Sequence, residues 1–132
     1  MRFLKARQAI ETLEAAITLP IAILVMLATV NLGMVVYGLQ AVQAAAREGA
    51  RMGSVAQQCS ACYALSAANG AIGSDPIVKQ SGVAILSPGG VAGSILTVRV
   101  SGQIPDFIGA FVPGLPGNFT VSAEATFRQE GW

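Results

Sequence analysis

Two carboxylates stand at the entrance of a long uncharged segment. Glu11 and Glu14 are three residues apart, and the next 32 residues, 15–46, carry no ionised side chain. This spacing places both acids on one face of a helix. A carboxylate drawn into an apolar bundle costs several kcal/mol unless a cation meets it. Two interpretations stay open for Glu14: an acid favoured by the dipole of a helix start, and a partner for a positive group of a neighbouring subunit.

The second motif with chemistry is CSAC, which contains both cysteines, Cys59 and Cys62. Two thiols cannot complete a four-ligand zinc site within one chain, and a redox motif is expected in a thioredoxin-like context. We therefore favour an extracytoplasmic disulfide at a helix end over a redox site, a metal site or two reduced thiols.

Other reactive residue types are scarce. The chain has no His, which excludes His-dependent base catalysis and His-rich metal sites. Lys79 could in principle activate Ser74 or Ser81 as a nucleophile, but nothing in the sequence sets either serine apart from the other serines of the chain. The sequence predicts a protein that is not an enzyme and that needs no cofactor.

The composition indicates a membrane or a large apolar partner. The 132 residues are 53% hydrophobic and only 11% charged, and a typical soluble protein has about 25% charged residues. The net charge of +1 and the 6% share of aromatic residues give neither a basic field nor stacking platforms for nucleic acid. One modest domain is expected from this length.

The N-terminal third predicts a single-pass membrane helix. Residues 1–9 are a basic leader without acids, which should stay in the cytoplasm. About 20 apolar residues cross a bilayer, so we expect a span over about 15–38 within one helix over 10–58. Pro20 should kink that helix. A secretory signal peptide is the alternative, but its apolar part should be only about 7–15 residues long.

The second half of this helix should stand outside the membrane. Gly49 and Gly53 form a small-xxx-small pair that permits close helix approach, although its Ala-rich surroundings also simply favour helix. Glu48 and Arg51 should form a solvated pair of little energetic weight.

Residues 59–132 should form a small extracytoplasmic β-rich domain. Strands are expected at 83–87, 94–102 and 119–128, because apolar and polar residues alternate in the last two. The predicted inward-facing residues are Leu96, Val98, Val100, Phe119, Val121, Ala123, Ala125 and Phe127. An isolated hairpin is marginal in water, so this face should pack on the long helix and give an α+β fold, with the helix on a small antiparallel sheet.

Two details of the sheet follow from the same pattern. Arg99 and Glu124 both fall on the polar face and should pair across strands. The apolar loop 103–118 should carry a helical turn around Asp106–Phe111. Its Phe107, Phe111 and Val112 should form a lid over the core or a contact patch for a neighbouring subunit.

The run QAIETLEAAITLP with AAREGAR, and the ending FTVSAEATFRQEG, resemble the TadE-like family of pilin-related proteins of tight-adherence pili. The resemblance rests on Glu14, on Pro20 six residues later, on residues 45–51 and on the last strand. It implies a prepilin that a membrane peptidase cuts between Ala9 and Ile10. The new amine of Ile10 would then be the cation that meets Glu14 of a neighbouring subunit.

We therefore predict a structural pilin-like subunit, a minor pilin or pseudopilin, that assembles through its apolar helix. The implied partners are other pilin subunits, a prepilin peptidase and inner-membrane pilus assembly proteins. One alternative is an assembly factor of the same secretion system that is retained in the membrane. Another is a signal-anchored envelope enzyme, for which the chain shows no activated nucleophile.

Overall fold

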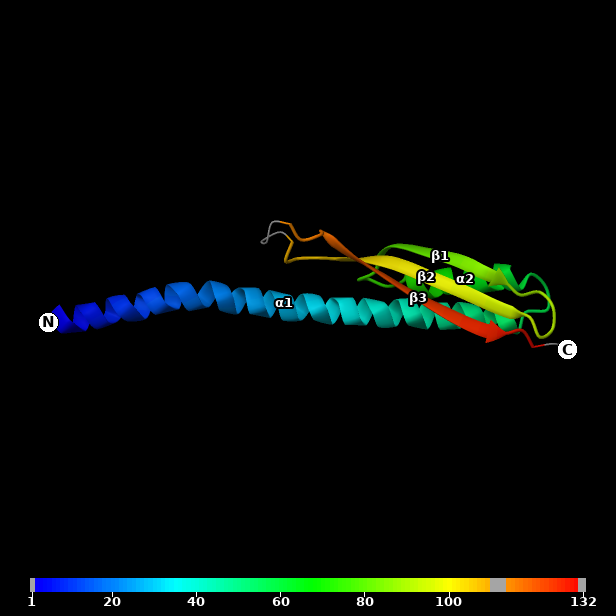
Figure 1. The fold of residues 1–132 in the computed structure, drawn as a ribbon, viewed down its shortest axis with the longest axis horizontal. Helices are drawn as coiled ribbons and strands as arrows, with labels where there is room; N and C mark the ends of the chain where they lie inside the picture. The colour runs from blue at the N-terminus through cyan, green and yellow to red at the C-terminus, as the bar shows by residue number, and fades with distance from the viewer. Residues whose placement is uncertain (1, 110–113, 131–132) are drawn as a thin grey trace.

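The computed structural model describes residues 2–109 and 114–130, with side chains from residue 11 onward. Its longest element is α1 (Arg2–Ser54), whose 53 residues extend over about 80 Å. Figure 1 shows that the rest of the chain packs beside the C-terminal half of α1 only, and that the N-terminal half projects alone. We call Glu11–Val30 the stalk, and we call α1 from Asn31 onward, with all that packs on it, the head.

The head adds a second helix, α2 (Ser60–Gly73), and three strands, β1 (Lys79–Pro88), β2 (Ile95–Pro105) and β3 (Asn118–Arg128). The strands form an antiparallel sheet in the order β1-β2-β3. The predicted α+β arrangement of a long apolar helix on a small antiparallel sheet is thereby confirmed.

The core lies between the sheet and the two helices, and most of its members are Ala or Val. The helices contribute buried residues mainly at intervals of three or four, and the central strand β2 contributes alternate residues, as the helix and strand periods require. The fully or nearly fully buried members are Val42, Ala45, Ala46, Ala50, Ala64, Ala68, Ile72, Val78, Leu96, Val98, Val100, Ile104, Val121 and Ala125.

The register of β2 against β3 agrees with the predicted faces except at one end. Leu96, Val98 and Val100 are buried, and Arg99 lies opposite Glu124, to which its Nε donates a hydrogen bond of 2.7 Å. Phe127, predicted to face the core, is 38% exposed. It pairs with buried Leu96 but lies near the end of an outer strand, where few neighbours cover it.

Two predictions about the helices were wrong. The first helix ends at Ser54 and not near residue 58, because the carbonyl of Ser54 accepts the N–H of Glu130 and the carbonyl of Ala56 accepts Nε2 of Gln129. These two groups donate to carbonyls that have no helical N–H donor at the end of α1. Residues 60–73 form α2, although we expected only β-like structure after residue 58.

The loop between β2 and β3 is described only in part. The predicted helical turn at Asp106–Phe111 extends beyond the described residues and stays a prediction; within them, the Asp106 carboxylate accepts the N–H groups of Ile108 and Gly109 at 2.8 and 3.2 Å. Phe107 is 50% exposed and is therefore not enclosed in the core. Phe111 and Val112 lie outside the described residues.

Candidate functional site

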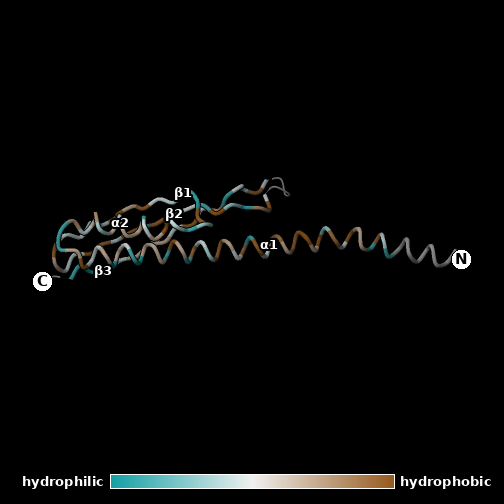
Figure 2. The backbone as a smooth tube through the Cα atoms, turned by 180° about the vertical axis from the view of Figure 1, so that it is seen from behind, coloured by the Kyte–Doolittle hydropathy of each residue, from teal (hydrophilic) through white to brown (hydrophobic). Residues whose placement is uncertain are grey.

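The stalk is a bare apolar helix. All of its 20 residues are exposed except Leu27, which is partly buried. Its large exposed apolar side chains are Leu13, Ile17, Leu19, Ile21, Ile23, Leu24, Val25, Met26 and Val30. Figure 2 shows this apolar run on the part of α1 that projects from the head. By length and composition the helix can cross a membrane.

The two acids lie at the N-terminal end of this surface. Glu11 and Glu14 are exposed, and the backbone carbonyl of Glu14 accepts a hydrogen bond of 2.9 Å from Thr18 Oγ1. In the full chain α1 begins at Arg2 and has no acid in its first turn. The helix dipole acts only within about one turn of the helix end, so it favours these acids only in a chain that begins near Ile10.

The other residues singled out near the stalk lie in continuous helix. α1 runs through Pro20 without interruption, and Figure 1 shows α1 as one gently curved helix. The backbone of Ala9 and Ile10 belongs to α1, but their side chains lie outside the described part of the chain. The processing site therefore stays a prediction.

A buried polar pair marks the junction between stalk and head. Nδ2 of Asn31 donates a hydrogen bond of 2.5 Å to Oδ1 of Asp106, which begins the loop after β2. Asn31 is only 3% exposed, and its Oδ1 has no hydrogen-bond partner among the described residues. With the N–H groups of Ile108 and Gly109, the Asp106 carboxylate receives three donors.

This pair was not predicted. Asn31 is a single polar residue in the apolar run, and Asp106 is the only acid in the loop 103–118. Both are unusual for their surroundings, and a buried polar group normally has a partner. An unusual polar residue of this kind is expected to have a buried partner. The two residues are 75 positions apart in the sequence, so no local pattern shows that they pair with each other.

Gly49 and Gly53 lie inside the head and face α2. A Cβ on Gly49 would lie 2.7 Å from Ala68 Cβ, and one on Gly53 would lie 2.8 Å from Ala64 Cβ. Ser60, Ala64, Ala68 and Ile72 recur at intervals of four and form the buried face of α2. The small residues therefore allow close packing within one chain, against a helix that we did not expect.

The two cysteines lie at the opposite end of the head from the junction. A disulfide joins Cys59 to Cys62, with Cα atoms 5.2 Å apart, and Cys59 directly precedes α2. Two hydrogen bonds hold the end of β1 near the cysteines and the C-terminal segment. Ser60 Oγ donates to the carbonyl of Pro88 at 2.7 Å, and Oε1 of Gln129 accepts the N–H of Gly90 at 2.7 Å.

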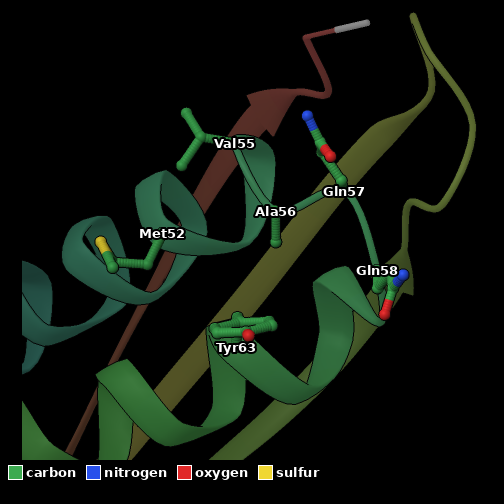
Figure 3. A pocket seen from close by; sticks show the side chains of 6 residues that line it. All are labelled: Met52, Val55, Ala56, Gln57, Gln58 and Tyr63. Carbon is green, nitrogen blue, oxygen red and sulfur yellow. The ribbon is translucent and has the colours of Figure 1, made fainter. Parts of the chain in front are cut away.

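An open hollow of about 370 Å³ lies between the end of α1 and the start of α2. Figure 3 shows Met52 of α1 and Val55, the residue that follows α1, on one side and Tyr63 from α2 on the other. Ala56, Gln57 and Gln58 complete the lining, which contains no carboxylate, amine or thiol. These residues offer no acid, base or nucleophile suited to catalysis near neutral pH.

Comparison with known proteins identifies one family. The model described as TadE-like protein matches residues 11–51, which include Glu14, Pro20, Asn31 and Gly49. The resemblance inferred from the sequence is thereby confirmed over this segment. No curated protein and no solved structure matches the chain.

Proposed function

We propose that this chain, with its TadE-like segment, is a structural pilin-like subunit of a tight-adherence pilus, a minor pilin or pseudopilin. The matched family is associated with these pili and is structural, not enzymatic. The observation that carries the proposal is the stalk, whose exposed apolar surface lies almost entirely within the matched segment.

The physical basis is the environment that the stalk requires. Burial of each large apolar side chain contributes about 1.5–3 kcal/mol, so nine such side chains cannot stay in water. A bilayer supplies one suitable environment, and its thickness of about 30 Å equals the length of 20 helical residues. A bundle of like helices supplies a second apolar environment. A subunit that moves from the membrane into a filament leaves the bilayer and buries its stalk in such a bundle.

The membrane span stays a prediction at about residues 15–38, and the uncharged run begins directly after Glu14. From Asn31 onward the head covers one face of α1, with Gly38 and Val42 buried against it. The N-terminus would lie in the cytoplasm and the head outside it, in agreement with the basic residues Arg2, Lys5 and Arg7. After assembly the subunit would belong to an extracellular filament.

Glu14 is the proposed docking residue. Cutting between Ala9 and Ile10 removes the three basic residues and leaves an amine on Ile10. That amine can meet the Glu14 carboxylate of a neighbouring subunit inside the bundle. The proposed partners are therefore other pilin subunits, the prepilin peptidase that makes the cut, and inner-membrane assembly proteins.

The two acids provide a matched test. Glu14→Ala should block incorporation into filaments and leave membrane insertion intact, because the span keeps its apolar residues. Glu11→Ala is the control and should incorporate normally, since the docking role is proposed for Glu14. Immunoblots of membranes and of sheared surface material measure both. Recovery of Glu14→Ala subunits from filaments at the wild-type level would contradict the docking role.

A further inference from the structure

We propose that the disulfide between Cys59 and Cys62 is a redox switch. A dithiol reductant opens it in the folded protein, and opening releases the connection between α1 and α2 while the rest of the head stays folded. The inference goes beyond the proposed role in a filament and does not depend on it, because it rests only on the contacts around the bridge.

The bridge is accessible from solvent. Both cysteines are exposed, and an open hollow adjoins each of them. One hollow, of about 230 Å³, includes Cys59 in its lining, and another, of about 250 Å³, includes Cys62. Exposed disulfides are the ones that exchange readily with thiols, since a thiolate must reach one of the two sulfurs. The reductant therefore needs no prior unfolding of the head.

The bridge holds Cys59 in a backbone conformation that few residues adopt. Cys59 has φ 44° and ψ 60°, in the left-handed region, which costs a residue with a Cβ about 1–2 kcal/mol. In this conformation its carbonyl oxygen accepts the N–H groups of Cys62 and Tyr63 at 2.9 and 3.2 Å. Once the bridge is open, Cys59 can return to negative φ, and both of these hydrogen bonds at the start of α2 are lost.

The neighbouring contacts do not depend on the bridge. Nε2 of Gln129 donates to the carbonyl of Ala56 at 3.0 Å, and the N–H of Glu130 donates to the carbonyl of Ser54 at 3.2 Å. These bonds join the end of α1 to the segment after β3 and remain when the bridge opens. The release is therefore local and is confined to about residues 57–63.

The released stretch shapes the hollow between α1 and α2. Gln57, Gln58 and Tyr63 are three of the six residues that line it, as Figure 3 shows. Gln58 directly precedes Cys59, and Tyr63 directly follows Cys62. The redox state of the bridge thus determines the form of this surface at the end of the head opposite the stalk.

The reaction is a thiol–disulfide exchange. A thiolate of the reductant attacks one cysteine sulfur, the bond between the two cysteine sulfurs breaks, and the other sulfur keeps the electron pair and takes up a proton. The second thiol of the reductant then attacks the mixed disulfide, and the reductant leaves as a cyclic disulfide. The second cysteine sulfur takes up a proton, so two electrons and two protons pass to the protein.

The rate of reduction tests access to the bridge. The full chain in detergent is mixed with dithiothreitol, alkylated after increasing times and weighed by mass spectrometry. Reduction of the folded protein should be within about tenfold of the rate for the chain unfolded in guanidinium chloride. A greater slowing by the fold would show that the bridge is shielded and would overturn the proposal.

Hydrogen–deuterium exchange tests the local release. Cys59→Ser with Cys62→Ser is a permanently open form, and Cys59→Gly with Cys62→Ser is its matched control, because Gly enters the left-handed region without steric cost. We expect exchange over 57–63 to rise about tenfold or more in the reduced wild type and in the Ser form, and to rise less in the Gly form. Exchange in β2 should stay unchanged.

Three results would contradict the switch. Unchanged exchange over 57–63 after reduction would show that the bridge holds nothing in place. Faster exchange in β2 as well would show that the whole head unfolds. Equal exchange in the Ser and Gly forms would show that the backbone of Cys59 is not what the bridge restrains.

Discussion

Asn31 and Asp106, 75 positions apart, are joined by a 2.5 Å hydrogen bond between Nδ2 and Oδ1 where the bare helix meets the head. Both residues are buried, and the bond joins the start of the β2–β3 loop to α1. Its position makes it a direct link between the head and the first residue of α1 beyond the stalk.

Loss of the Asp106 carboxylate should loosen this link. Asp106→Ala removes three hydrogen bonds and leaves the Asn31 amide buried, which should cost about 2–4 kcal/mol of unfolding free energy. Thr126→Ala, on the exposed face of β3, removes only a solvent-exposed hydrogen bond to Thr97 and should cost under about 1 kcal/mol. Denaturant unfolding of the full chain in detergent compares the two, and equal losses would show that the pair has no special weight.

Close helix packing should make Gly53 intolerant of a methyl group. A Cβ there would lie 2.8 Å from both Ala64 Cβ and the Ser60 carbonyl oxygen, so Gly53→Ala should destabilise the head by about 1–3 kcal/mol. Gly70 lies in α2 with open space around it, and Gly70→Ala should be neutral or stabilising by up to about 1 kcal/mol. Thermal unfolding of the two variants should shift in opposite directions or, at the least, by clearly different amounts.

The two members of one cross-strand pair should respond differently to truncation. Leu96 is fully buried and Phe127 opposite it is 38% exposed. Leu96→Ala should cost about 2–5 kcal/mol, and Phe127→Ala should cost less than that despite the larger side chain. Protease resistance of the full chain ranks them; the reverse order would place Phe127 in the core and refute the described strand end.

The disulfide should be present in protein from the native envelope. Alkylation without a reductant should label neither Cys59 nor Cys62, and alkylation after reduction should label both. The closed loop is very short, so the stabilisation through loop entropy should be small. Mass spectrometry counts the adducts, and two adducts without reductant would disprove the bridge in the native protein.

An element could be predicted where its own residues show a clear apolar pattern. The uncharged run predicted α1, and the alternation from Phe119 to Phe127 predicted β3 and the pairing of Glu124 with Arg99. α2 was missed because three of the four residues on its buried face, Ser60, Ala64 and Ala68, are small and give only a weak apolar periodicity. The early end of α1 and the Asn31–Asp106 pair depend on partners distant in sequence, which no local pattern specifies.

The intact mass of the native protein, measured separately in membranes and in sheared surface filaments, tests the proposed function most directly. The account predicts that the protein is present in the sheared material and that its mass there corresponds to a chain beginning at Ile10. Protein found only in membranes, with a mass that still includes Met1 and the basic leader, would contradict assembly into a filament.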